Sequence, residues 1–418
     1  MREIPPRWLP WIALILFIAG AFNDPPWRGY SPAAEIPIET EPIRVALSLL
    51  QNGAFADPFA ALPTGPTAHC APAFPLIVFV LMKLLGTGSA GWLALRSLAT
   101  AALSLQFALL PYLARAFGYS SVVGILAAVL GILTKPGKEE RWEANLAGLL
   151  CLLLAAAALR SWTRTTAALA SLATYLQPVL LLPYFAWLLY TKRKSLLLWL
   201  APLLVAVPWM IRNQSAIGSL AFIRDNLGIE LNISFNDCTP ATFDQSAAAN
   251  CIQRLHPNSA ASEAAEVRDL GEVRYNQTRQ QQALAWIRNN PSATISLIAQ
   301  RAWYFWFPSS SGLSGYATQR PRTWLLHLIT LLSFLGLWWA RSGAGKQPAA
   351  ASLLSSFYLL FPLIYYALLS VPRYRNPILW ITWLLAASAL ARLFSGNPHS
   401  PIPVPPRQSN HPGHIPLQ

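Results

Sequence analysis

The stretch that decides the fold is PIETEPIRVALSLLQNGAFADPFAALPTGPTAHCAPAFPLIVFVLMKLLG, residues Pro37 to Gly86. In its first half apolar residues recur at helical spacing between Ile43 and Leu50, with polar residues on the opposite face. Such an amphipathic helix lies on a membrane rather than through it. A turn-rich segment follows, and then an apolar helix of about a dozen residues, too short for a bilayer that needs roughly twenty. We expect this stretch to form a shelf on a membrane surface.

The composition outside this stretch is that of a membrane protein. Of the 418 residues, 54% are hydrophobic and 11% are charged, and the mean hydropathy is +0.38. These values predict a polytopic membrane protein and not a soluble domain. The net charge of +14 comes from small basic groups between apolar segments, which is typical of signals that orient membrane spans. A nucleic-acid-binding protein would gather them on one solvated face, so we expect no nucleic-acid partner.

The apolar segments predict an all-α bundle of about ten membrane spans with both termini in the cytoplasm. The region 165–190 is read as two short helices that meet near the outer face at Gln177 and Pro178, so we expect Gln177 to be reachable from outside. The expected spans are residues 8–22, 91–114, 122–134, 145–159, the two helices of 165–190, and then 196–210, 324–339, 353–369 and 378–393.

Polar residues are concentrated in two outer regions, the shelf and one longer segment. The longer segment contains a helical stretch from Glu263 to Asn290, closed by Pro291. The expected domains are an N-terminal bundle (1–210) with its first outer loop (24–89), a small extracytoplasmic domain (211–300), C-terminal transmembrane helices (301–395) and a disordered cytoplasmic tail (396–418).

The four cysteines have different surroundings. Cys151 falls within a span and Cys70 on the shelf, whereas Cys238 and Cys251 share the outer domain. Because an outer compartment is oxidising, the last two predict a disulfide worth roughly 3 kcal/mol by loop entropy. Two free thiols are the alternative. A zinc site is not expected, since His256 is the only histidine near these cysteines and no paired-cysteine spacing occurs.

Acidic residues of the outer loops are candidates for a catalytic base. Glu39 and Glu41 stand at the start of the shelf, and Glu140 and Glu143 lie in the short outer loop before the fourth span. A carboxylate at a membrane surface can take a proton from a hydroxyl when partial burial raises its pKa. Ordinary solvated loop charges are the competing interpretation.

Basic residues at the outer face are candidates for binding a phosphate. The short outer loop before the fourth span contains three basic residues, which the positive-inside rule would not place there. A second basic group lies between the last two spans. Arginine suits a partly desolvated phosphate better than lysine does. Mutual neutralisation within the loop and contact with lipid headgroups are the alternatives. The candidates are Arg96, Lys83, Lys138, Arg141, Arg373 and Arg375.

The order of these features resembles that of the GT-C superfamily of membrane glycosyltransferases, which includes protein O-mannosyltransferases and aminoarabinose transferases. The resemblance covers most of residues 1–395. It lies in the acidic residues after the first span and in the segments Asn52–Phe55, Pro72–Gly86, Trp92–Arg96, Val207–Asn213 and Arg373–Pro377. A bacterial group within the superfamily is also similar in Gly65-Pro66-Thr67-Ala68-His69, Asn236-Asp237-Cys238 and His256-Pro257-Asn258.

This resemblance implies an inverting transfer of a sugar from a polyprenyl-phosphate donor to an unidentified glycan, lipid or protein acceptor. The reaction would take place at the outer face of the cytoplasmic (inner) membrane, with an acidic residue of the first outer loop as base. Many relatives have Asp where this chain has Glu39 and Glu41. No cofactor is implied firmly, and a divalent cation is possible because members differ. A lipid-linked-sugar flippase and a non-catalytic lipid-binding scaffold are the other interpretations.

Overall fold

The computed structural model describes residues 4–23, 25–134, 143–308, 320–342 and 348–395. The secondary-structure elements in these residues are all helices. Six helical segments of the described chain are long and apolar enough to cross a membrane: Pro6–Asn23, Ser89–Ala116, Leu196–Ile217, Pro321–Ser342, Pro348–Tyr366 and Pro372–Phe394. Shorter apolar helices cover Ala73–Leu85, Ser121–Thr134, Ala144–Leu159 and Pro178–Tyr190. The prediction of an all-helical polytopic membrane protein is confirmed.

The membrane bundle is built around two helices that are distant in sequence. Helix α4 (Ser89–Ala116) packs against α1 (Leu9–Asn23) and α5 (Ser121–Thr134), and α20 (Leu379–Ser395) packs against α5 and α17 (Arg320–Ser342). Gly124 of α5 permits the close approach to α4, since a Cβ there would lie 2.4 Å from the Cα of Pro111. Helices α6 (Ala144–Leu159), α7 (Thr163–Leu176), α8 (Leu181–Tyr190), α9 (Leu196–Leu204), α10 (Val207–Ile217) and α18 (Pro348–Leu360) complete the bundle.

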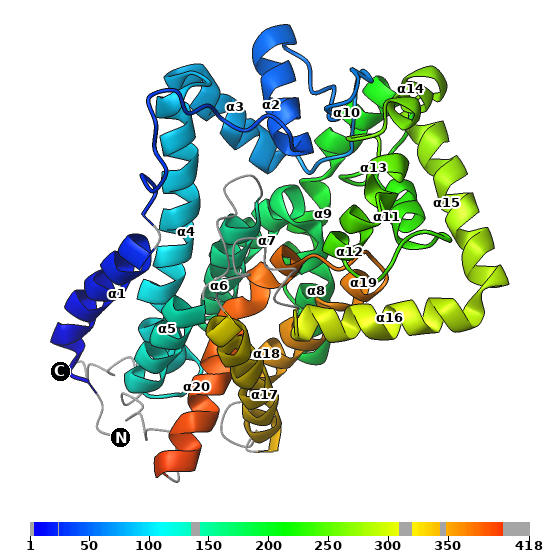
Figure 1. The fold of residues 1–418 in the computed structure, drawn as a ribbon. Helices are drawn as coiled ribbons and strands as arrows, with labels where there is room; N and C mark the ends of the chain where they lie inside the picture. Colours follow the sequence, from blue (N-terminus) through cyan, green and yellow to red (C-terminus); the bar gives the residue numbers. More distant parts are fainter. Residues whose placement is uncertain (1–3, 24, 135–142, 309–319, 343–347, 396–418) are drawn as a thin grey trace, which may run out of the picture.

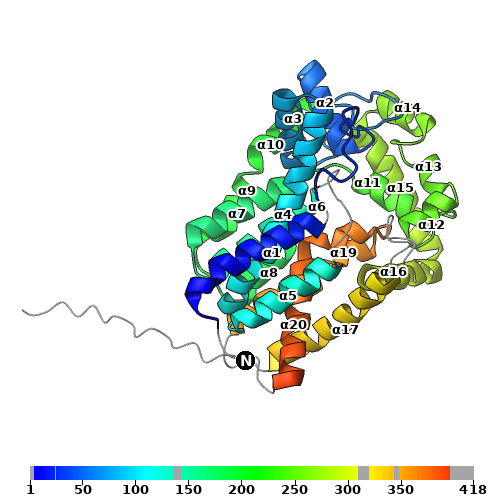
Figure 2. The same ribbon diagram turned by 60° about the vertical axis from the view of Figure 1, so that its left-hand side comes forward.

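The predicted shelf consists of α2 (Glu41–Asn52) and α3 (Ala73–Leu85). They pack against each other, and α3 also packs against α4, so that α3 lies between α4 and α2 in Figure 1; Figure 2 shows the same three helices from another side. Helix α2 ends at Gly53, whose φ of 66° allows its N–H to close the last turn on Leu49. Ile43 and Ala46 are fully buried, which is the apolar face that the spacing predicts.

The predicted break between two short helices is confirmed at Gln177, where α7 ends and a 3₁₀ turn (Pro178–Leu180) leads into α8. The exposure expected for Gln177 is wrong. Its side chain is 9% exposed and donates a hydrogen bond of 2.7 Å to the hydroxyl of Tyr365. Pro178 ends helix α7, but the side-chain amide of Gln177 stays buried because it binds Tyr365 inside the bundle.

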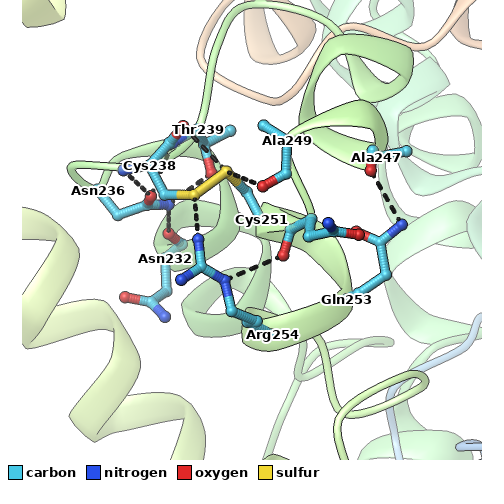
Figure 3. The surroundings of a disulfide bond; sticks show 10 residues. Asn232, Asn236, Cys238, Thr239, Ala247, Ala249, Cys251, Gln253 and Arg254 are labelled. Atoms are coloured by element: carbon cyan, nitrogen blue, oxygen red, sulfur yellow. Dashed lines mark hydrogen bonds between the residues drawn. A yellow bond between two sulfur atoms is a disulfide. The ribbon is translucent and has the colours of Figure 1, made fainter.

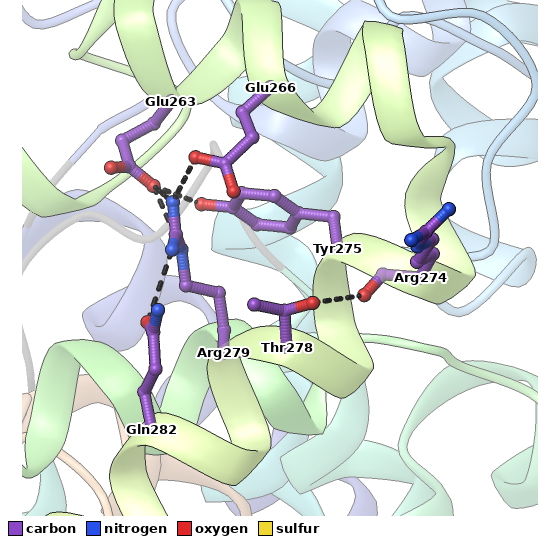
Figure 4. Close-up of polar contacts among 7 residues, drawn as sticks. All are labelled: Glu263, Glu266, Arg274, Tyr275, Thr278, Arg279 and Gln282. Atoms are coloured by element: carbon purple, nitrogen blue, oxygen red, sulfur yellow. Dashed lines mark hydrogen bonds and ion pairs between the residues drawn. The ribbon is translucent and has the colours of Figure 1, made fainter.

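The segment predicted to form the outer domain, and called by that name below, contains α11 (Leu227–Ser234), α12 (Phe243–Ala248), α13 (Cys251–Leu255), α14 (Ala261–Leu270) and α15 (Glu272–Asn289), and it continues into α16 (Pro291–Trp306). The helix expected from Glu263 to Asn290 is instead two helices, because Gly271 has a φ of 80°. Figure 4 shows Arg279 of α15 between Glu263 and Glu266 of α14. The hydroxyl of Tyr275 also donates to Glu263, so this cluster fixes the bend.

The predicted disulfide joins Cys238 to Cys251, with their Cα atoms 5.7 Å apart. Asn236 places the first cysteine, because its Oδ1 accepts hydrogen bonds from the backbone N–H groups of Cys238 and Thr239 (Figure 3). This side-chain turn gives the Asn236-Asp237-Cys238 motif a structural role. Cys70 and Cys151 are buried free thiols.

Candidate active site

Three side chains from separate segments meet where the shelf faces the outer domain. Glu41 is the first residue of α2, His69 lies in the loop before α3, and His256 follows α13. All three are more than nine-tenths buried, and one potential ligand atom from each lies within 4.8 Å of the others. Glu41 Oε1 and His256 Nε2 are 3.8 Å apart. We refer to these residues as the Glu–His cluster.

The side chain of Asn258 in the outer domain binds the segments before and after helix α2. Its Oδ1 accepts a hydrogen bond of 2.8 Å from the N–H of Ala60, and its Nδ2 donates one of 2.9 Å to the carbonyl of Glu39. The turn that carries His256 is therefore tied to the segment just before Glu41. This contact accounts for a histidine and a glutamate 215 positions apart being held together.

The loop that carries His69 is held from the opposite side by Glu272, the first residue of α15. This carboxylate accepts hydrogen bonds from the hydroxyl of Thr67 and, at 2.7 Å, from the N–H of Ala68. Two arginines bind carbonyls of the same loop, Arg212 that of Thr67 at 2.6 Å and Arg224 that of His69 at 2.9 Å. The Gly65–His69 motif is therefore a loop whose shape depends on the outer domain.

Burial shifts the acid–base properties of the cluster. It raises the pKa of Glu41, an effect that the positive charges of Arg373 and Arg224 oppose and the negative charge of Glu143 reinforces. Burial also lowers the pKa of His256 and takes the pKa of His69 well below its ordinary value. At neutral pH both imidazoles are therefore uncharged beside a carboxyl group with increased proton affinity, which is the condition that favours a general base.

Arginines stand near this carboxylate. Arg224 lies in the segment between α10 and α11 and Arg373 at the start of the last span, and the charges of both act on Glu41. Arg373 lies over the ring of Tyr374 with 5.4 Å to its centroid, and that ring stacks on Tyr365 at 4.6 Å. Cations beside a buried carboxylate can hold an anion while the carboxylate accepts a proton.

Two predicted phosphate ligands have other partners. Arg375 is 3% exposed and donates to the carbonyl of Trp306 at 2.8 Å and to the hydroxyls of Thr330 and Thr382 at 2.9 and 3.1 Å. Arg96 donates to the carbonyls of Pro26 and Arg28 at 2.7 and 3.1 Å. Both guanidinium groups are bound by protein atoms, and their place in a ring of basic residues around a phosphate stays a prediction.

The other predicted residues have various positions. Lys83 is exposed on α3, 5.7 Å from the centroid of Phe79. Glu39 is exposed whereas Glu41 is buried, so the structure separates two carboxylates that the sequence could not. Glu143 acts electrostatically on Glu41. Glu140, Lys138 and Arg141 lie outside the described residues.

Sequence reasoning did not select His69, His256 or Arg224 as site residues. The two histidines belong to motifs that were noted only for their resemblance. Arg224 carried no signal of its own, because a single arginine beyond the outer end of a span is also typical of headgroup contact. Burial beside Glu41 is what gives these residues their importance.

The expectation of no zinc site concerned the surroundings of Cys238 and Cys251, whereas the Glu–His cluster offers one carboxylate and two imidazoles as potential metal ligands. A metal-bound histidine ordinarily donates from its second ring nitrogen to an acceptor. Here Nδ1 of His256 instead accepts a hydrogen bond of 3.0 Å from the N–H of Asn258. Glu41 and His69 remain as suitable ligands, so the cluster as it stands fits a divalent cation poorly.

No protein-family profile matches the chain, and no curated protein matches it. Among solved structures, it is similar to the archaeal oligosaccharyltransferase AglB from Archaeoglobus fulgidus, in complex with an inhibitory peptide and a dolichol-phosphate, at 13% identity and a TM-score of 0.49. That match covers 93% of this chain and 50% of AglB, so the chain spans about half the length of AglB. ArnT from Cupriavidus metallidurans, bound to undecaprenyl phosphate, is similar at 12% identity and a TM-score of 0.32, covering 90% of this chain and 78% of ArnT. Both are GT-C superfamily members.

Proposed function

We propose that this protein transfers a sugar from a polyprenyl-phosphate donor to an acceptor hydroxyl at the outer face of the cytoplasmic membrane. The observation that carries the proposal is the buried carboxylate of Glu41, raised in pKa and near two arginines, in a chain with membrane-spanning helices. This combination supplies a base and an anion-binding group in one site. The order of the sequence motifs supports the same reaction class.

In the proposed reaction Glu41 removes the proton of the acceptor hydroxyl. The acceptor oxygen forms a bond to the anomeric carbon as the bond from that carbon to the phosphate oxygen breaks. A single displacement of this kind inverts the configuration at the anomeric carbon. The proton resides on Glu41 until solvent takes it, and the lipid phosphate leaves as an anion.

We assign Arg224 and Arg373 to the departing phosphate. Arg224 uses its Nε atom for the carbonyl of His69, and its two terminal nitrogens donate no hydrogen bond to another described residue. Arginine can bind a phosphate through two parallel hydrogen bonds. Fixed positive charge at a site of low dielectric stabilises the negative charge that develops as the bond breaks.

The experiment uses purified full-length protein in liposomes with radiolabelled polyprenyl-phosphate sugars and a panel of acceptors. Appearance of the label in an acceptor, slowed by roughly 10² to 10⁴-fold in Glu41→Gln, supports the transferase. Movement of intact lipid-linked sugar across the bilayer without cleavage would make the protein a flippase. Lipid binding with neither transfer nor transport would leave a scaffold.

A further inference from the structure

The orientation of the His256 ring is set by the backbone of the turn in which it lies. The N–H of Asn258 donates a hydrogen bond of 3.0 Å to Nδ1 of His256, so that nitrogen presents its lone pair. A neutral imidazole has one protonated and one unprotonated ring nitrogen. The proton of neutral His256 therefore resides on Nε2, which is the nitrogen that faces Glu41 Oε1 at 3.8 Å.

This tautomer restricts what His256 can do. It cannot act as a general base, because its one lone pair is occupied by the N–H of Asn258. It is also a poor metal ligand, because Nε2 would have to lose its proton while Nδ1 faces a donor. The role that remains is that of an N–H group placed beside the carboxylate of Glu41, 3.8 Å from its Oε1 and so longer than a hydrogen bond in this state.

A donor at this point matters because Glu41 is nearly excluded from water. The residue is 8% exposed, so its carboxylate has little access to water. A hydrogen bond from its own backbone also acts on the Glu41 carboxylate and lowers its pKa, and the charged groups that act on it are Arg373, Arg224 and Glu143. Those acting on His256 are Glu230 and Glu263.

We propose that His256 is a positioning residue for Glu41: its Nε2–H faces Oε1 and leaves the second carboxylate oxygen for the acceptor hydroxyl, with the backbone of Asn258 enforcing the required tautomer. This inference rests on the proposed function only in taking Glu41 as the base. The Glu–His cluster is accordingly a site for moving a proton rather than for holding a cation.

Three variants of His256 separate a positioning donor from a base and from a ligand. The side-chain amide of His256→Gln can place an N–H at the position of Nε2. The shorter amide of His256→Asn lies near the position of Nδ1, and His256→Ala has no side-chain N–H at either position. We expect transfer by the Gln variant within about tenfold of wild type, and a loss of about 10²-fold in the Asn and Ala variants, as for a misplaced catalytic group. Equal losses in all three variants would overturn the proposal.

The pH profile gives a readout that a purely structural role would not move. An N–H donor favours the charged carboxylate, so its removal raises the pKa of Glu41. The acidic limb of kcat/KM should therefore move to higher pH in the Ala and Asn variants and stay in place in the Gln variant. An unchanged limb in His256→Ala would contradict the proposal.

Two NMR measurements on the full-length protein do not depend on activity. The ¹⁵N resonances of His256, assigned by their loss in His256→Gln, should show Nε2 protonated and Nδ1 unprotonated at neutral pH, and they should not change when zinc is added. The ¹³C resonance of the Glu41 carboxyl group should titrate at higher pH in His256→Ala than in wild type. The opposite tautomer, a zinc-dependent shift, or an unchanged Glu41 titration would overturn the inference. Failure of sugar transfer with these signatures intact would overturn the proposed function alone.

Discussion

The carboxylate of Glu272 accepts a hydrogen bond of 2.7 Å from the backbone N–H of Ala68, a residue 204 positions earlier in the chain. The same carboxylate accepts from the hydroxyl of Thr67. One buried side chain at the start of α15 therefore holds the loop that presents His69 to Glu41. The region that contains α15 is thus a structural part of a site formed largely by residues before α3.

Glu272 makes the stability of the protein depend on pH. Burial raises its pKa to about 8, so between its unfolded pKa and that value the folded state binds more protons than the unfolded state. The contribution of Glu272 to stability should be fully present below its ordinary pKa of 4.5 and fall by up to about 1.4 kcal/mol per pH unit as the pH rises from there towards 8. Thermal unfolding measured across this range should show the fall in wild type and a smaller one in Glu272→Gln. The same slope in both proteins would argue against a buried, titrating Glu272.

Replacing Glu41 by Gln keeps the size of the side chain and removes its basicity. We expect turnover to fall by roughly 10² to 10⁴-fold while the donor lipid still binds. The raised pKa of Glu41 also predicts that wild-type activity is lost on acidification at a pH above the usual range for Glu. Glu39→Gln is the matched control, because Glu39 is exposed two residues earlier. Equal losses in the two variants would show that burial does not select the base.

Arg224 and Arg375 should fail in different ways when replaced. Arg224→Ala should raise the KM for the donor by about 10 to 100-fold, since a charge-assisted hydrogen bond contributes about 1.5–3 kcal/mol. Arg224→Lys keeps the charge and should recover part of this loss. Arg375→Ala should instead lower thermal stability by about 1–3 kcal/mol, because it leaves Trp306, Thr330 and Thr382 without a donor. A raised KM with normal stability in Arg375→Ala would return that residue to the phosphate site.

The disulfide between Cys238 and Cys251 should stabilise the outer domain. Replacing both cysteines by Ser should lower its free energy of unfolding by about 2–4 kcal/mol. A thiol reagent should label neither residue until the protein is reduced, as followed on non-reducing gels. Labelling of both without reductant would contradict the disulfide. Cys70 and Cys151 are internal references, because both are buried free thiols.

Features that depend on short stretches of chain could be predicted from the sequence alone. Apolar segments long enough for a bilayer, the two helices predicted for the shelf, the helix break at Gln177 and the pairing of Cys238 with Cys251 all appear in the structure. Each follows from length, hydropathy, proline or cysteine chemistry within about twenty residues. The failure at Gly271, where one expected helix is two, has the complementary cause. Gly271 takes a φ of 80° there, and the contacts of Arg279 with Glu263 and Glu266 across the bend hold the two helices in place.

The site itself was decided by tertiary structure. The sequence offered several outer carboxylates and cations of equal standing, and only packing separated buried Glu41 from exposed Glu39. Packing also directed Arg375 into the bundle and brought His69 and His256 to Glu41. The physical reason is that local pattern determines whether a segment is helical and apolar, whereas the burial, pKa and partners of a polar side chain depend on segments up to about two hundred residues away that pack against it.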